Sequence, residues 1–558
     1  MEIGIDVGGT FTDGVVMNGG QVVNWVKKET GEDIASSIQG VLEQLLAGID
    51  PFSVKRVVLS TTLITNIIAQ GRVAPAGLIL LPGPGVNPRD LPFAAKAEII
   101  KGAVDYRGRI IEKIDPAEVS AALKRFLDSG ISRIAVACKF SQRNPALEEE
   151  ISRLIEEECP AVRVLASSRV SGLLNWVRRA NGAVFSLQVS DDYRLFAGEV
   201  AVSMERLGLK CPVCILKADG GTIPLEQSLQ RPLEGIFSGP AASTLGALAA
   251  GGEGLTSVVM DTGGTTTDLA LVLEGRPLFS EKGAFVNGYP VCTRAMAVAS
   301  LALGGDSTIT LENGRVVLGE RYGKAMCLGG ARLTVTDALV YLGLSDLAGR
   351  EKILPILEEM SRRHGLEAGE LAEKAVSIFL ESLERKLEEM FAVWEEEPAY
   401  RIWQVISGQK KRPRTVVCLG GPAKGLGILW GKKKGWQVIV PRHAQVANAI
   451  GAALSKTTLR LDFFADTQQM IYSTNIGGLH GSLEHILPNL EEAKQFAESL
   501  FRQAAKELDM PVSRSETLYE EGFNIIRGWN TLGKIYQIGM QTPPGLRAFL
   551  EKGAGTGA

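Results

Sequence analysis

Histidine, cysteine and long apolar runs are scarce in this sequence, and each shortage excludes a class of protein. Only 4 of the 558 residues are His, at positions 364, 443, 480 and 485, so a His-based nucleophile system is not evident. No run approaches about 18 uninterrupted apolar residues, so we expect no membrane span. The first residues enter a strand-like pattern directly, and we therefore expect no secretory signal.

Charge and cysteine content set further limits. The net charge of -3 provides no general attraction to nucleic acid or acidic membranes, so we expect neither as a partner. The 7 Cys are scattered and odd in number, which is typical of a reduced, cytoplasmic protein. Cys211 and Cys214 form one C-x-x-C without a second pair or a nearby His, which favours ordinary packing over a zinc site.

The chain is too long for one ordinary core, so we expect two large lobes and an appendage. Strand-like and helix-like patterns alternate in its first part, which predicts an α/β fold with helices covering a sheet. The expected strands are 3–7, 11–17, 57–59, 76–81 and 134–137, and the expected helices are 34–47 and 116–129.

Later segments differ in character. Residues 352–397 have the apolar spacing of a long amphipathic helical region. The last hundred residues contain a helical pattern over 490–508, a weak strand pattern over 523–527 and a Gly-rich tail from Gly553. We therefore expect an appended C-terminal segment with a frayed end.

One hairpin pattern occurs twice, nearly half the chain apart. The first copy reads Asp6-x-Gly8-Gly9-Thr10-x-Thr12-Asp13, and the second reads Asp261-x-Gly263-Gly264-Thr265-x-Thr267-Asp268. Either copy alone also fits an ordinary turn. Because both copies agree at every fixed position, the repeat predicts a duplicated domain.

The repeated turns have the chemistry of a phosphate site. Glycine lacks a Cβ, so a phosphate oxygen can approach the backbone N–H groups, and threonine hydroxyls add donors. The predicted ligands of the phosphates are Gly8, Gly9, Thr10, Thr12, Gly263, Gly264, Thr265 and Thr266. Two such hairpins on opposite walls of a cleft would hold a triphosphate, with lobe closure during turnover.

Four aspartates flank these turns. Asp6 and Asp261 end the strands that lead into them, and a carboxylate there attracts phosphate only through a bound cation, so we predict both as Mg²⁺ ligands. Asp13 and Asp268 would either orient a metal-bound water or fix the turn by an Asx bond, and the sequence leaves both roles open.

A third glycine element follows an apolar strand over 415–419. Gly420, Gly421 and Pro422 would let the flat ring of adenosine lie against bare backbone. The small-residue run from Val446 to Ala453 predicts a tightly packed helix beside the cleft. The predicted ligands are therefore ATP and Mg²⁺.

Several blocks of the sequence follow one another in a recognisable order. They are 4–13, Ser60-Thr61-Thr62-Leu63-Ile64-Thr65-Asn66, Asn144-Pro145, Ser238-Gly239-Pro240-Ala241-Ala242, 260–265, Thr334-Val335-Thr336-Asp337-Ala338 and 446–453. Together they cover about residues 1–456 and resemble the hydantoinase A/5-oxoprolinase family, whose ATP-using subunit has actin-like architecture.

The resemblance implies a fold, a reaction and a partner. The implied fold is α/β, with duplicated actin/hexokinase/chaperone-like (ribonuclease H-like) domains around a nucleotide cleft. The implied domains are 1–180, 181–456 with a helical insertion, and an appended 457–558. The implied reaction is ATP-dependent hydrolysis of a cyclic amide of the hydantoin or 5-oxoproline type, through phosphorylation of the carbonyl oxygen. A B-type hydantoinase subunit is the implied partner.

Thr62 and Asn66 complete the predicted site. With Thr61 they lie where a strand is expected to run into a helix, and they would contact the γ-phosphate or the substrate, or else cap the helix. We predict Asp6, Asp261, Thr62 and Asn66 as catalytic residues.

The segment before Thr334 departs from the family pattern. Residues 318–330 replace a longer Pro/Gly-rich stretch that relatives usually carry, and this difference concerns the substrate pocket. Three interpretations stay open: a cyclic amidase subunit, an ATP-driven activator or a carboxylase subunit acting with a protein partner, and a small-molecule kinase. The family blocks disfavour the kinase.

Overall fold

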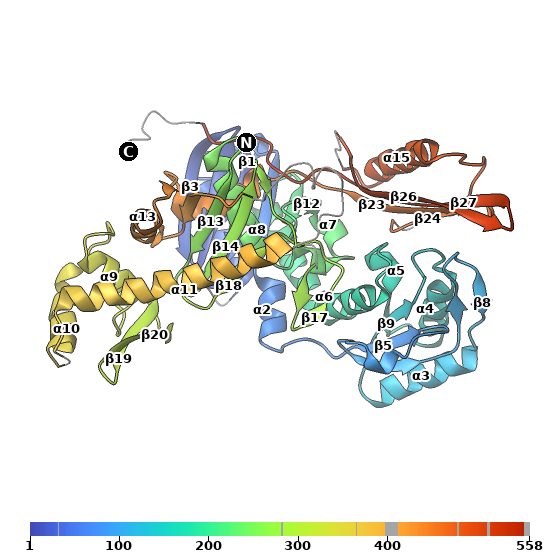
Figure 1. Cartoon of the computed structure of the whole chain (residues 1–558), viewed down its shortest axis with the longest axis horizontal. Coiled ribbons are helices and arrows are strands. Elements are labelled where there is room, and N and C mark those ends of the chain that lie inside the picture. The colour runs from blue at the N-terminus through green and yellow to red at the C-terminus, as the bar shows by residue number, and fades with distance from the viewer. Residues whose placement is uncertain are drawn as a thin grey trace.

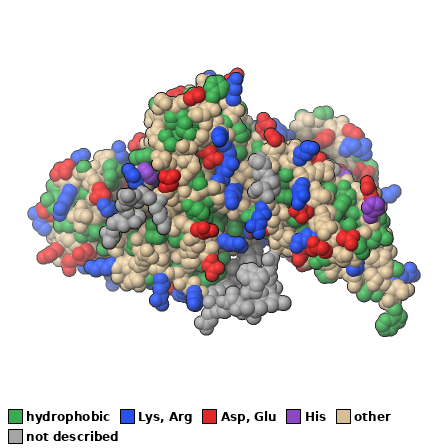
Figure 2. Space-filling view, turned by 90° about the horizontal axis from the view of Figure 1, so that it is seen from above, with side chains coloured by type: hydrophobic (Ala, Val, Ile, Leu, Met, Phe, Trp, Pro, Cys, Tyr) green, Lys and Arg blue, Asp and Glu red, His purple; other side chains and the backbone are tan. Residues whose placement is uncertain are grey.

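The computed structural model describes residues 1–551, apart from 32, 281–282, 364, 397–410, 477–478 and 511–513. The expected tail from Gly553 lies outside these residues. Figure 1 shows two sheets in the main body, a smaller α/β unit beside it and a C-terminal sheet layer above that unit. On the face seen in Figure 2, acidic and basic side chains are interspersed. Among the described helices, none combines the length and apolar character that a membrane crossing requires.

The first sheet of the main body is built around the N-terminal strand. Its order is β12-β11-β4-β1-β2-β3, with β1 antiparallel to β2 and parallel to β4. The strands are β1 (Glu2–Val7), β2 (Phe11–Asn18), β3 (Gln21–Glu29), β4 (Arg56–Thr61), β11 (Val213–Leu216) and β12 (Thr222–Pro224). One face packs on α1 (Ile34–Leu45) and α6 (Trp176–Arg206), where the side chains of Ile3, Ile5 and Val7 are fully buried.

The second sheet repeats the centre of the first. Its path is β15-β14-β13-β21-β22, with β18 also pairing with β14, and β13 is antiparallel to β14 and parallel to β21. The strands are β13 (Ser257–Thr262), β14 (Thr267–Leu273), β15 (Arg276–Pro277), β18 (Val298–Leu301), β21 (Thr415–Leu419) and β22 (Gln437–Ile439).

The two hairpins match in detail. Asp6 pairs with Asp13 across β1 and β2, and Asp261 pairs with Asp268 across β13 and β14. The N–H of Gly8 donates to the carbonyl of Phe11 at 3.0 Å, and the N–H of Gly263 donates to that of Thr266, also at 3.0 Å. These matches confirm the duplicated α/β fold.

Two helices of small residues lie between the sheets, namely α8 (Ser238–Gly251) and α14 (Ala447–Leu454). A Cβ on Gly451 would lie 2.1 Å from the carbonyl oxygen of Ala242, and one on Gly246 would lie 2.2 Å from that of Ala447. Because these obstacles are backbone atoms that cannot rotate away, only glycine permits this helix crossing. The prediction of a tightly packed helix over 446–453 is confirmed.

A helical insertion covers the outer face of the second sheet. It includes β19 (Ser307–Glu312), β20 (Arg315–Arg321), α9 (Val335–Tyr341), α10 (Arg350–Arg363) and α11 (Ala368–Glu396), and α13 (Ala423–Lys434) joins it. The helical region expected over 352–397 is thus two helices, of which α11 is the long one in Figure 1. Short elements elsewhere are β16 (Phe285–Val286), β17 (Tyr289–Pro290), α2 (Leu63–Ala69) and α7 (Leu225–Ser228).

The smaller α/β unit is a parallel sheet in the order β10-β9-β5-β6. It contains β5 (Gly77–Leu81), β6 (Lys96–Ile99), β9 (Arg133–Cys138), β10 (Arg163–Ala166), α3 (Pro116–Asp128), α4 (Ala146–Glu158) and α5 (Ser167–Val170), with a short hairpin of β7 (Ala103–Val104) and β8 (Ile110–Glu112). One face of this parallel sheet packs on the first half of α6. The second half of α6 packs on the first sheet of the main body, so this helix joins the two parts. The predicted domain limits stay predictions; the one after residue 180 falls inside α6.

The C-terminal residues form an antiparallel sheet, β25-β24-β23-β27-β26, covered by α15. Its elements are β23 (Arg460–Asp466), β24 (Ile471–Thr474), β25 (Gly481–Ser482), α15 (Leu490–Glu507), β26 (Glu516–Arg527) and β27 (Asn530–Gln541). The expected helix over 490–508 is confirmed, and the weak strand pattern over 523–527 is the end of β26. A buried ion pair of 2.9 Å between Arg107 and Asp466 joins this layer to the smaller unit. The chain then returns to the first lobe, where Arg547 pairs with Glu2 at 2.6 Å.

Candidate active site

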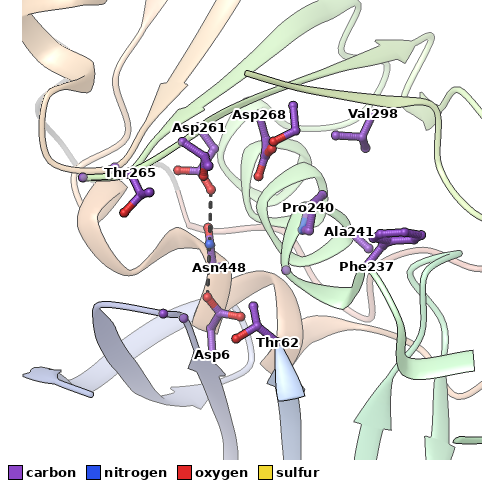
Figure 3. Close-up of a pocket in the computed structure, with 18 of the residues that line it drawn as sticks. Asp6, Thr62, Phe237, Pro240, Ala241, Asp261, Thr265, Asp268, Val298 and Asn448 are labelled. Carbon is purple, nitrogen blue, oxygen red and sulfur yellow. Dashed lines mark hydrogen bonds between the residues drawn. The ribbon is translucent and has the colours of Figure 1, made fainter. Parts of the chain in front are cut away.

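A cavity of 1630 Å³ lies between the two glycine hairpins, and Figure 3 shows part of its wall. The cavity brings together the two glycine turns, the third glycine element at 420–422 and the start of α2. The predicted site residues that line it are Asp6, Gly8, Gly9, Thr10, Thr62, Asn66, Asp261, Gly263, Gly264, Thr265, Thr266, Gly420, Gly421 and Pro422. The two turns therefore share one cleft, as the duplicated pattern predicts.

The centre of the site is a pair of carboxylates that share one amide. Nδ2 of Asn448 on α14 donates to Oδ2 of Asp6 and to Oδ2 of Asp261, at 3.2 Å in each case (Figure 3). The hydroxyl of Ser243 on α8 also donates to Oδ2 of Asp261. Oδ1 of Asp6 is buried and has no hydrogen-bond partner among the described residues. One carboxylate oxygen is thus left for a ligand that the protein does not supply.

Burial changes the acidity of three aspartates near the turns. Burial, together with the nearby carboxylates of Asp13 and Asp261, raises the pKa of Asp6 from 3.8 to about 7, against the opposing effect of side-chain hydrogen bonds such as that from Asn448. It also raises the pKa of Asp13 to about 6, against the opposing effect of Lys27, and that of Asp268 to about 6, against a hydrogen bond from Ser300. Gathering these charges in a partly dry cleft is costly without a cation.

These carboxylates fit a hydrated magnesium ion better than a metal held by protein ligands alone. Within the described residues, no three His, Cys, Asp or Glu side chains converge on one point. Mg²⁺ usually keeps several waters and takes only one or two carboxylates together with substrate phosphates. Asp6 and Asp261 would hold such an ion, and the unpartnered Oδ1 of Asp6 suits contact with it or its water.

Both turns present free backbone donors. In the described part of the chain, the N–H groups of Gly9, Thr10, Gly264 and Thr265 have no hydrogen-bond acceptor. A further hydrogen bond fixes the second turn, in which Asp306 donates its N–H to the carbonyl of Gly264 at 2.8 Å. The turns are therefore rigid loops whose amides are available for phosphate oxygens.

Thr12 is the predicted phosphate ligand that does not line the cavity. Its side chain is fully buried, and its hydroxyl lies 3.0 Å from that of Thr30. The expectation that it contacts phosphate is therefore corrected. The cause is strand geometry: successive side chains of β2 point to opposite faces, so Thr12 and Asp13 cannot both face the cleft.

The residues at the start of α2 do face the cavity. The hydroxyl of Thr62 donates to the carbonyl of Val7 at 3.1 Å and accepts from Nδ2 of Asn66 at 3.2 Å. Thr62 makes no side-chain capping bond. The Thr61 hydroxyl instead accepts from the N–H of Leu63 at 3.1 Å. Thr62 is thus the N-cap residue of α2 without a capping side-chain bond, and the hydroxyl of the preceding Thr61 accepts from the first N–H of the helix instead.

The third glycine element needs its glycine. Gly420 has a φ of +87°, and a Cβ there would lie 2.1 Å from the carbonyl oxygen of Thr262. Next to it, Gly421 has no atom within 4 Å of the position of a Cβ. This leaves bare backbone on the side of the cavity that also carries Leu339 and Leu347, an arrangement suited to a purine ring.

The cavity extends past the carboxylates into an apolar arm. Phe237, Pro240, Ala241 and Val298 line it, and Figure 3 places them on the far side of Asp268 from Thr265. Phe237 has a left-handed φ of +58°, which is strained for an aromatic residue and is often found at binding sites. The arm gives space for a small apolar substrate beside the phosphate site.

Sequence reasoning missed three polar residues of the site. Asn448 is a single amide in a run of small apolar residues, and that contrast could have identified it. Lys27 on β3 pairs with Asp13 at 2.7 Å, so Asp13 is held by an ion pair. Arg321 contacts the turn residues Thr10 and Thr265 across the cleft, and no local pattern marks it.

Comparison with known proteins places this chain in a family. The hydantoinase/oxoprolinase family matches residues 179–460, just over half of the chain, and its N-terminal region matches residues 2–159. The caprolactamase subunit alpha of Pseudomonas jessenii is 25% identical over 61% of this chain and 54% of its own. The acetophenone carboxylase gamma subunit of Aromatoleum aromaticum is 27% identical over 61% of this chain and 53% of its own. The chain thus spans about half the length of these relatives.

Solved structures agree on the fold. The ATP-dependent caprolactamase from Pseudomonas jessenii has a TM-score of 0.71 at 19% identity, with 97% of this chain and 87% of that chain covered. A nucleotide-free acetone carboxylase has a TM-score of 0.68 at 17% identity, with 98% and 87% covered. The chain belongs to the hydantoinase/oxoprolinase family.

Proposed function

We propose that this protein is the ATP-using subunit of an enzyme that activates a cyclic amide by phosphorylating its carbonyl oxygen. The observation that carries the proposal is the pair of glycine turns on one cavity, with Asp6 and Asp261 joined through Asn448. Two turns with free amides on opposite walls suit a triphosphate, and the shared carboxylates suit its Mg²⁺.

The chemistry follows from the stability of amides. Resonance lowers the electrophilicity of an amide carbonyl, so water attacks it slowly. The carbonyl oxygen would attack the γ-phosphorus, the bond from that phosphorus to the β,γ-bridging oxygen would break, and ADP would leave. The product is an O-phosphorylated imidate once the amide N–H loses its proton. Its carbon accepts water readily, with phosphate as the leaving group.

Residues of this chain would position the reactants. The amides of the two turns would hold phosphate oxygens, and Asp6 and Asp261 would keep the metal between them. Thr62, which lies beside Asp6 in Figure 3, and Asn66, which donates a hydrogen bond to Thr62, would contact the γ-phosphate or the carbonyl oxygen. Mg²⁺, when bound, supplies neutralisation of phosphate charge. Such positioning and electrostatic effects account for most catalysis of phosphoryl transfer.

The apolar arm supports a small cyclic amide as the substrate. Its aromatic and aliphatic walls lie next to the phosphate site, where a lactam ring could pack while its carbonyl points to the turns. Relatives named for acting on lactams include the caprolactamase and the 5-oxoprolinase 1 of Arabidopsis thaliana, which is 24% identical over 64% of this chain. We propose a hydantoin or 5-oxoproline type of substrate.

A partner protein would complete the reaction. The relatives are named as subunits, alpha in the caprolactamase and gamma in the acetophenone carboxylase. We propose that a B-type subunit opens the activated ring. The carboxylase relatives support one alternative, in which the same ATP site phosphorylates a ketone enolate for carboxylation or drives an activating change in a partner protein.

Lactam-stimulated ADP release is the direct test. The purified chain, with and without its B-type partner, would be given Mg-ATP and hydantoin, 5-oxoproline or caprolactam. Release of ADP that rises with a lactam supports the proposal. Release that rises only with acetophenone or acetone and bicarbonate, or only with the partner protein, would support the alternative instead. Asp261→Asn should reduce the stimulated rate by roughly 100-fold or more.

A further inference from the structure

Arg321 joins the two phosphate turns across the cleft. It is the last residue of β20, in the segment whose sequence departs from the family pattern. Its Nη1 donates to Oγ1 of Thr10 at 2.9 Å and to Oγ1 of Thr265 at 3.3 Å. Among the described cationic residues that line the cavity, Arg321 alone contacts both turns.

The rest of the guanidinium is held in place from one side. Its Nε lies 3.2 Å from Oδ2 of Asp306 and donates to the carbonyl of Gly323 at 3.0 Å. Asp306 itself donates its N–H to the second turn, at Gly264. Nη2 makes no hydrogen bond of its own in the described part of the chain. The group is therefore oriented by the second lobe and keeps one nitrogen free.

The position of Arg321 matches the charge that a nucleotide would bring. A triphosphate carries more negative charge than one divalent ion neutralises, and four aspartates already surround the turns. Lys27 is paired with Asp13, and Arg321 is paired with Asp306, but of these two cations only Arg321 also contacts both turns. The threonine hydroxyls that now accept from Arg321 are donors suited to phosphate oxygens. An incoming phosphate could take the place of these acceptors and bind the same guanidinium.

We infer that Arg321 binds the transferred γ-phosphoryl group, reaching it from between the two turns. The inference rests on the proposed function of this site. A planar guanidinium offers paired N–H donors to phosphate oxygens and stays charged at every working pH. Arginines that contact the transferred phosphoryl group in other enzymes raise kcat by roughly 10³-fold or more. Because Arg321 also contacts both lobes, it would bind the γ-phosphate only when the two turns have closed on the nucleotide.

The test compares two nucleotides that differ in the γ-phosphate. Binding of Mg-AMPPNP and of Mg-ADP would be measured by calorimetry for the wild type, Arg321→Gln and Arg321→Lys. Arg315→Gln is the matched control, because Arg315 begins the same strand and is exposed. Thermal unfolding would establish that each variant is folded.

We expect Arg321→Gln to weaken AMPPNP binding at least tenfold and to change ADP binding by less than threefold. Arg321→Lys should recover part of the lost AMPPNP affinity, since lysine keeps the positive charge but lacks the paired N–H donors of the guanidinium. Equal losses for both nucleotides would mean that Arg321 only holds the lobes together, and that result or an unchanged AMPPNP affinity overturns the inference. A wild type that binds neither nucleotide overturns the proposed function as well. If AMPPNP binding behaves as expected but no lactam stimulates ADP release, only the proposed substrate fails.

Discussion

Replacing Asp6 by Asn should make the nucleotide-free protein more stable at pH 8 while it removes ATP turnover. Asp6 is 7% exposed, and the nearby carboxylates of Asp13 and Asp261 act on it. A carboxylate in such a place prefers its proton, which is why burial raises its pKa to about 7. An asparagine side chain keeps the shape and the oxygen that accepts from Asn448 but never becomes charged.

The sign and size of this effect follow from proton linkage. The folded state holds the Asp6 proton up to about pH 7, whereas the unfolded chain releases it near 3.8. The stability associated with the proton is therefore complete below pH 3.8 and is lost as the pH rises through about 7. The full loss at pH 8 corresponds to about 4 kcal/mol, taken as an upper limit. The Asp6→Asn variant avoids this loss.

Denaturant unfolding at pH 4 and pH 8, without nucleotide or metal, measures the effect. Asp6→Asn and wild type should unfold at similar denaturant concentrations at pH 4, and the variant should be the more resistant at pH 8. Asp128→Asn is a control on the exposed end of α3 and should show no such difference. Saturating Mg-ATP should stabilise the wild type by roughly 2–4 kcal/mol and the variant much less. A variant no more stable than wild type at pH 8 would refute the assignment of a desolvated carboxylate.

Three other substitutions test separate parts of the structure. Asn448→Leu should abolish detectable AMPPNP binding, because the two carboxylates lose their shared donor; an unchanged affinity in a calorimetric titration would contradict this. Gly451→Val should destabilise the protein by at least roughly 1–3 kcal/mol in thermal unfolding, since α8 backbone occupies the Cβ position. Arg107→Leu should cost roughly 3–5 kcal/mol by leaving Asp466 buried and unpaired, and limited proteolysis should then release the C-terminal layer. Arg109→Leu, which removes an exposed guanidinium from the same hairpin, is the control and should leave both readouts close to those of the wild type.

The glycine hairpins could be predicted because their information is local. A strand, a Gly-Gly turn and a second strand are adjacent in the chain, and the same residues serve both as the turn signal and as the phosphate site. Repetition of the pattern at Asp261 made the duplicated fold predictable as well. Because the family blocks follow one another in the family's order, the cleft between the two lobes could be predicted as well.

Thr12 illustrates where local reasoning stops. Its hydroxyl is chemically suited to phosphate, yet the pleat of β2 directs it toward Thr30 and leaves Asp13 on the cleft side. The sequence contains the alternation of β2 but not which of its faces becomes the wall of a cavity. That choice depends on how the sheet packs against its neighbours.

The sequence by itself determined the paired turns, the aspartates beside them and the family, because each is written in contiguous residues. Only the tertiary structure decided that Asn448 joins Asp6 to Asp261 and that Arg321 joins Thr10 to Thr265. Three of these four contacts connect residues at least 187 positions apart, and their distances depend on how the two sheets pack around the close crossing of α8 and α14. No local pattern encodes such a distance, because it is set by the packing of the whole fold.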